Sequence, residues 1–280
     1  MTFYWGKSFI FVIHSNFTDL DTLNFLKKGK GVLFCVLFAL FSEGNVSAQE
    51  NKKAPRSEGY WLAYFGDNKI NKIVGIHSEL QLRSFFVPDN VGTVIARVGV
   101  NFYIKPFITG TVGYGYIFSL PENDEIYGAR TSENRIWEQM LFRQKTKAVF
   151  MEHRFRLEQR FVQNLSTQSS SVSHRIRYRF QTLFPLYTIS PHLRHLFVSV
   201  NDEIMLNFKS EPAQIFDRNR FYAGLGYQVS PKLNIQLGYL NQFANVSFST
   251  RGHVDHVVQL SVAYNMDDLM QTFFKKKQDK

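Results

Sequence analysis

The sequence has one cysteine and no apolar run long enough to form a membrane-spanning helix. The cysteine, Cys35, lies near the N-terminus, so a chain processed beyond it has no disulfide, thiolate metal site or cysteine nucleophile. The one uninterrupted apolar run is Val32 to Phe41, whereas a helix that crosses a bilayer needs about 20 apolar residues. The 280 residues carry a net charge of +10 and are 16% aromatic, a composition atypical of helical membrane proteins.

The N-terminus has the three parts of an export signal in order. Lys27, Lys28 and Lys30 supply positive charge, Val32 to Phe41 forms the apolar core, and small residues end at Ala48 before Gln49. A short N-terminal membrane anchor would need a longer apolar segment. We therefore predict that residues 1–48 are an N-terminal extension plus a signal peptide cleaved between Ala48 and Gln49.

The rest of the chain predicts a β-barrel over residues 59–266, after a polar lead-in at 49–58 and before a charged tail at 267–280. Stretches of about 10 to 14 residues alternate with period two and are separated by clusters of Asn, Asp, Ser, Pro and Gly. The expected strands are Val74 to Phe85, Thr93 to Ile104, Phe107 to Phe118, Asn134 to Gln144, Phe150 to Val162, Val172 to Phe184, Leu196 to Phe208, Arg218 to Val229, Leu233 to Phe243 and His253 to Met266.

The two faces of these stretches favour a transmembrane barrel over a soluble β-sandwich. In Thr93 to Ile104, Val98, Val100 and Phe102 share one face, while Arg97 shares the other with glycine and polar residues. Sandwich strands are usually about 5 to 6 residues long, whereas these strands can cross the apolar band of about 25 Å. The chain is therefore expected in the outer membrane of a bacterial cell.

Connection lengths predict the strand number. Tight turns such as Lys105-Pro106 and Ser230-Pro231 alternate with longer loops such as Leu120 to Ser132, as in outer-membrane barrels. This pattern gives about ten strands with both termini periplasmic, and leaves Tyr60 to Phe65 as an accessory segment. Twelve strands is the alternative, and Pro185 to His195 is long for a periplasmic connection.

Charged residues gather on one face of the middle strands and are expected to face the lumen, since charge on the lipid face is costly. Glu158 and Glu203 are candidates to pair with arginines across the interior. The full set is Glu152, Arg154, Arg156, Glu158, Arg160, Arg175, Arg177, Arg179, Asn201, Glu203 and Arg220.

Three functions are compatible with this interior. A paired network filling a narrow barrel would be structural, and a lumen with excess arginine would form an anion-preferring pore or passive solute channel. An outer-membrane lipid or peptide hydrolase would need a serine and a carboxylate beside a histidine such as His153, His174 or His256. No catalytic spacing is recognisable, so no enzyme, cofactor or metal site is predicted. Expected partners are outer-membrane lipids and the barrel-insertion machinery, with no nucleic acid and with the oligomeric state open.

Several short motifs follow one another along the chain from Tyr60 to Tyr264. They are Trp61-Leu62-Ala63-Tyr64-Phe65, Glu133-Asn134-Arg135-Ile136-Trp137, His153-Arg154-Phe155-Arg156-Leu157-Glu158-Gln159-Arg160, Arg177-Tyr178-Arg179, Asn201-Asp202-Glu203 and Asn219-Arg220-Phe221-Tyr222-Ala223-Gly224-Leu225-Gly226-Tyr227. In their order and spacing they resemble the domain-of-unknown-function 2490 family of predicted outer-membrane proteins. The resemblance implies a barrel of unassigned activity and supplies no catalytic residues.

Overall fold

The computed structural model describes residues 56–85, 91–120, 130–146, 148–208, 215–245 and 252–265. All of them belong to one compact unit, Ala54–Lys280. The predicted signal peptide with its cleavage site at Ala48 and Gln49, most of the lead-in and the charged tail lie outside the described residues, and they stay predictions.

Eleven strands form one sheet that closes on itself as a barrel in the described part of the chain. Each of the ten predicted strands overlaps one of β2 to β11. The strands are β1 (Arg56–Lys69), β2 (Val74–Phe85), β3 (Val91–Lys105), β4 (Ile108–Ser119), β5 (Thr131–Lys145), β6 (Phe150–Asn164), β7 (Ser170–Pro185), β8 (Leu196–Phe208), β9 (Phe216–Ser230), β10 (Leu233–Asn245) and β11 (Gly252–Asn265).

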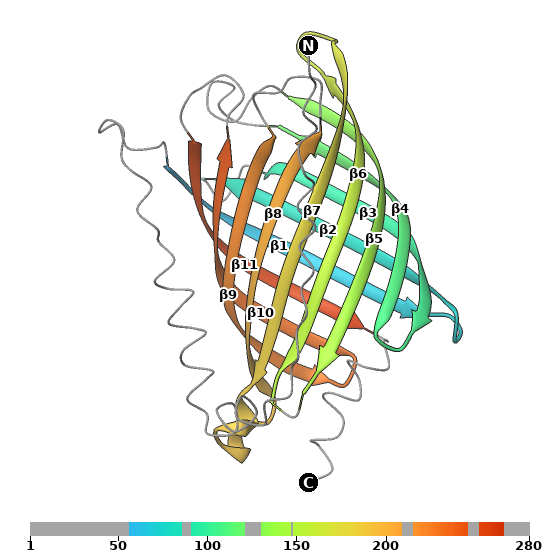
Figure 1. Cartoon of the computed structure of the whole chain (residues 1–280). Helices are drawn as coiled ribbons and strands as arrows, with labels where there is room; N and C mark the ends of the chain where they lie inside the picture. Colours follow the sequence, from blue (N-terminus) through green and yellow to red (C-terminus); the bar gives the residue numbers. More distant parts are fainter. Residues whose placement is uncertain are drawn as a thin grey trace, which may run out of the picture. The chain divides into compact units, whose positions relative to one another are not determined.

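The predicted even strand number is wrong, because the supposed accessory segment is a full strand of the wall. Tyr60 to Phe65 is the centre of β1, which pairs with β2 antiparallel and with β11 parallel. Figure 1 shows β1 in blue beside β11 in red, running in the same direction. An odd number of consecutive hairpin strands must close with one parallel pair, so the first and last strands start at the same end of the barrel. The prediction that both termini lie on the periplasmic side does not fit this closure.

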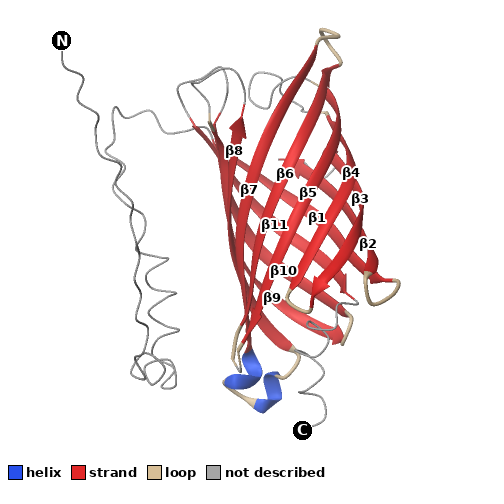
Figure 2. Ribbon diagram, turned by 45° about the vertical axis from the view of Figure 1, so that its right-hand side comes forward, coloured by secondary structure: helices blue, strands red, loops and turns tan. Residues whose placement is uncertain are grey.

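The long connection Pro185 to His195 contains two short 3-10 turns, η1 (Leu186–Thr188) and η2 (Pro191–Leu193). They lie at the end of the barrel that also carries the tight turns (Figure 2). Thr188 Oγ1 donates a hydrogen bond of 2.8 Å to the carbonyl of Pro185. No helix among the described residues is long and apolar enough to cross a membrane.

Side chains alternate between an apolar outer wall and a polar interior. On β3, Val98 is 53% exposed and Phe102 43%, while Arg97 and Asn101, each directly before one of them, are buried. The same alternation appears on β9, where Leu225 and its outward neighbours are exposed. Successive side chains of a strand point to opposite faces of the sheet, and in a closed barrel one face is the outer wall and the other the lumen. A sequence that alternates apolar and polar residues therefore places apolar side chains outside and polar side chains inside.

Two glycines make room for the largest buried ring of the interior. Trp137 on β5 is fully buried, and its six-membered ring covers Gly113 on β4 and Gly99 on β3. A Cβ at Gly113 would lie 2.4 Å from Trp137 Cζ2, and one at Gly99 would lie 2.9 Å from Trp137 Cη2. Glycine is required there because the indole occupies the space of a side chain.

Candidate functional site: the charged interior

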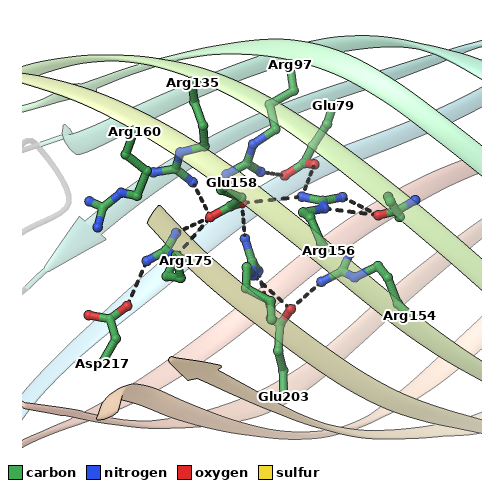
Figure 3. A network of polar contacts seen from close by, with 12 residues as sticks. Glu79, Arg97, Arg135, Arg154, Arg156, Glu158, Arg160, Arg175, Glu203 and Asp217 are labelled. Carbon is green, nitrogen blue, oxygen red and sulfur yellow. Dashed lines mark hydrogen bonds and ion pairs between the residues drawn. The ribbon is translucent and has the colours of Figure 1, made fainter. Parts of the chain in front are cut away.

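The inward residues of β5 to β8 form a connected set of arginines and carboxylates (Figure 3). Of the predicted set, Glu152, Arg154, Arg156, Glu158, Arg175, Arg177, Glu203 and Arg220 are buried, while Arg160 and Arg179 have side chains 20% exposed. Alternation along each strand points these groups inward, and antiparallel pairing brings their strands side by side. The contacts between them decide whether this interior is filled or open.

Glu158 on β6 is the centre of this network. Its carboxylate accepts hydrogen bonds from Arg175 Nη2 at 2.6 Å, Arg177 Nη1 at 2.9 Å and Arg135 Nη1 at 3.2 Å. The residue is 0% exposed. A buried carboxylate is tolerated when several charged donors satisfy its oxygens, so three guanidinium groups from β5 and β7 hold it in place.

Two further carboxylates extend the network on either side of Glu158. Glu203 on β8 accepts from Arg154 Nη2 at 2.5 Å and from Arg177 Nη2 at 2.8 Å, so Arg177 bridges Glu158 and Glu203. Asp217 at the start of β9 accepts from Arg175 Nη1 at 2.7 Å. Arg175 and Arg177 of β7 are therefore each shared between two acids.

The wall at β2 and β3 closes the network from the other side. Glu79 accepts a hydrogen bond from Arg97, and Arg156 Nη1 lies 3.8 Å from Glu79 Oε2. Arg156 also donates through Nε and Nη2 to Gln139 Oε1 at 3.0 and 2.7 Å, and its guanidinium carbon lies 4.6 Å from the centre of the Trp137 ring. Arg156 thus reaches across the lumen between opposite walls.

The remaining predicted members lie at the edges of this network. Arg160 pairs with Glu133 at 2.8 Å, and Glu152 accepts from Arg143 at 2.9 Å and from Arg179 at 2.7 Å. Asn201 borders a cavity in the lumen. Arg220 is bonded to an amide instead of an acid, as its Nε donates to Gln242 Oε1 at 2.6 Å.

Sequence reasoning missed about as many network residues as it named. The missed residues are Asp67, His77, Glu79, Arg97, Glu133, Arg135, Gln139, Arg143, Asp217, Gln242 and Asp255. Four of them occupy alternate positions of β5, where the outward Glu138 obscured the pattern. Counting alternate positions from Trp137 would have found these four.

A cavity of about 210 Å³ opens beside the network. Its border reaches Tyr264 and Asn265 at the end of β11, level with the tight turn between β9 and β10. Glu158 does not border it. The charged border residues that the structure describes are eight arginines, Arg83, Arg97, Arg143, Arg154, Arg156, Arg177, Arg179 and Arg220, and four carboxylates, Asp67, Glu79, Glu152 and Glu203.

Several described histidines lie within hydrogen-bonding distance of a tyrosine hydroxyl or an aspartate. His153 Nδ1 lies 2.8 Å from the Tyr178 hydroxyl on the outer wall, and His256 Nδ1 lies 2.5 Å from the Tyr239 hydroxyl. His253 Nε2 lies 2.7 Å from Asp255 Oδ1 in the interior. No group of three or more metal-binding side chains is found in the described part of the chain.

The fold and its interior define a closed β-barrel with an apolar outer wall and a lumen crossed by paired charges. The chain belongs to the family described as protein of unknown function (DUF2490), whose sequence profile matches residues 58–252. No curated protein matches it. Among solved structures it is similar to the NanC porin in a rhombohedral crystal form, at 11% identity and a TM-score of 0.46, over 74% of this chain and 97% of that one.

Proposed function

We propose that this chain is an outer-membrane β-barrel with a structural role, whose lumen is closed by its own charges. The observation that supports the proposal most directly is Glu158, which is 0% exposed and bonded to three arginines inside the barrel. A water-filled pore at this level would leave such a carboxylate hydrated. The exposed Val, Phe, Leu and Tyr of the outer wall support the membrane location.

The location is tested by membrane fractionation together with heat-modifiable migration on a gel. We expect the protein in the outer-membrane fraction, with a folded band that migrates differently from the boiled one. Protein recovered in the soluble periplasmic fraction would contradict the membrane location.

The closed lumen is tested by single-channel recording of the refolded protein in a planar bilayer. We expect no stable conductance steps from protein whose insertion is shown by protease protection. Regular steps in the native chain would contradict the structural proposal.

An anion-preferring channel is the second candidate, and the arginine excess around the cavity favours it. Eight arginines against four carboxylates give this part of the lumen a positive potential. If the network opens, the pore should select anions over cations. Arg156→Ala, which removes a guanidinium between opposite walls, should then raise conductance and lower anion selectivity.

We propose no catalytic activity, and we propose outer-membrane lipids and the insertion machinery as partners. A lipid or peptide hydrolase remains the third candidate from the sequence. Hydrolysis of ester or amide substrates by the purified protein, lost in His153→Ala, would support it over the structural role.

A further inference from the structure

One region of the cavity holds two arginines against a single tryptophan. The guanidinium carbon of Arg83 on β2 lies 4.0 Å from the centre of the Trp61 ring, and that of Arg220 on β9 lies 5.0 Å from it. Their hydrogen bonds go to neutral amides: Arg83 Nη2 to Gln81 Oε1 at 2.6 Å and Arg220 Nε to Gln242 Oε1 at 2.6 Å. Within the described part of the chain, neither arginine forms an ion pair. This arrangement differs from the network around Glu158, where every arginine shares an acid.

The same region has buried donors that lack an acceptor. Trp61 Nε1 and the Tyr222 hydroxyl have no hydrogen-bond partner among the described residues, although both side chains are 3% exposed. Both residues border the cavity together with Arg83 and Arg220. A buried polar group without a partner is unfavourable. Two cations and two free polar groups around one space are chemically suited to an anionic acceptor.

The wall beside these donors is apolar. Trp61 and Tyr222 pack with Leu240 and Val257 into one buried cluster from β1, β9, β10 and β11. Leu240 also borders the cavity. A ligand here would therefore contact guanidinium groups at one end and hydrocarbon at the other.

The volume sets the size of such a ligand. The whole cavity, of which this region is one part, measures about 210 Å³, and an engineered protein cavity of about 150 Å³ holds a benzene molecule. A single aromatic ring with one carboxylate is therefore the upper limit of size, while a bare inorganic anion would leave the apolar wall uncovered. Organic anions with an apolar body match both halves of this space.

We propose that the barrel binds a small organic carboxylate with an apolar or aromatic body, held by Arg83 and Arg220 against Trp61. The carboxylate accepts hydrogen bonds from the two guanidinium groups. The body of the ligand packs on Trp61, Tyr222 and Leu240. The proposal depends on the barrel interior and is independent of whether the lumen conducts.

Benzoate is the probe, titrated calorimetrically into the purified, refolded protein in detergent micelles. We expect saturable binding of benzoate, with acetate and inorganic phosphate at least tenfold weaker. Arg83→Gln and Arg220→Gln should each weaken benzoate binding at least tenfold, because each removes a charged donor. The control Arg194→Gln, in the exposed turn after η2, should bind benzoate as the native chain does.

Two further variants keep the test independent of folding. Arg220→Lys retains the charge and should keep part of the affinity, while Trp61→Phe retains an aromatic ring without the indole N–H and should weaken binding severalfold. Circular dichroism and heat-modifiable migration establish that each variant is folded. Benzoate binding that is equal in native and Arg220→Gln protein, or phosphate binding as tight as benzoate, would overturn the proposal. Absent benzoate binding from a folded, non-conducting barrel would overturn this inference alone and leave the structural role intact.

Discussion

The two sides of the barrel interior are filled by different kinds of buried side chains. The wall of β5 to β8 fills its share of the lumen with shared ion pairs centred on Glu158. The wall of β9 to β11 and β1 contributes an apolar cluster, Trp61, Tyr222, Leu240 and Val257. Carboxylates on the first wall are paired with arginines, whereas Arg220 on the second wall is bonded to an amide. Each wall also holds an indole N–H without a partner among the described residues, Trp137 Nε1 on the first and Trp61 Nε1 on the second. The difference teaches that the charged wall should respond to the loss of an ion partner, and the apolar wall to the loss of packed hydrocarbon.

The largest effect is expected at the centre of the charged wall. Glu158→Gln leaves three buried guanidinium groups without their shared carboxylate, and breaking a buried ion pair costs about 3 to 5 kcal/mol. Urea unfolding of the barrel refolded in lipid vesicles measures the loss. Glu58→Gln, an exposed glutamate of β1, is the control and should change little. A loss below about 1 kcal/mol in Glu158→Gln would show that the charges are hydrated.

The apolar wall should respond as an ordinary hydrophobic core. Leu240→Ala removes buried hydrocarbon next to an existing cavity, and such truncations cost about 2 to 5 kcal/mol. We expect the lower part of that range, because water can enter the enlarged cavity. The same urea titration measures it, and Leu237→Ala on the outer face of β10 is the matched control. A neutral Leu240→Ala would mean that the cluster does not contribute to stability.

On the outer wall we expect a substitution that increases the free energy of unfolding, by less than the losses expected inside. Glu138 lies outside at the centre of β5, where it accepts a hydrogen bond from Gln159 Nε2 at 3.1 Å. Glu138→Leu should stabilise the lipid-embedded barrel by about 1 kcal/mol, since a carboxylate facing hydrocarbon is unfavourable. Unfolding in vesicles, compared with unfolding in detergent, checks this. Destabilisation in vesicles would indicate that the hydrogen bond from Gln159 outweighs the cost of placing the Glu138 carboxylate against lipid.

The smallest effect is expected at the edge of the charged network. Arg218 pairs with Asp217 at 3.1 Å, but its side chain is 27% exposed and Asp217 keeps Arg175 as a second partner. Arg218→Ala should therefore cost about 0.5 kcal/mol, as for partly exposed pairs. A loss as large as that of Glu158→Gln would mean that the network acts as one cooperative unit.

Local alternation made the wall predictable, while pairing across the lumen was not. The inward direction of Arg154, Arg156 and Glu158 follows from the period of two along β6. Gln139 lies opposite Arg156 in the β5–β6 hairpin, so that contact needs only the register of the hairpin. The contact with Glu79 cannot be read in this way, because β2 is not a neighbour of β6 in the sheet. Trp61 was noticed as part of a motif and not as part of a site. Arg83 lies opposite it only when β1 is recognised as a strand that pairs with β2, and Arg220 lies far away in the sequence.

The strand count failed for a related reason. Tyr60 to Phe65 alone is short, and its polar continuation to Lys69 hid a strand of 14 residues. Its role as a wall strand depends on β11, about 200 positions later in the chain. Alternation within a short stretch of sequence does not predict a pairing over that separation.

The parallel junction of β1 and β11 also bears on how the barrel is assembled. Every other neighbouring pair joins consecutive segments, and its ends are brought together by a short stretch of chain. This junction instead requires that the beginning and the end of the sheet meet, which carries the largest loop-closure entropy in the molecule. Parallel ladders are also slightly less stable per residue than antiparallel ones. We therefore expect the β1–β11 pair to form last during insertion and to exchange its amide hydrogens first. An incompletely assembled barrel would then be open between β1 and β11.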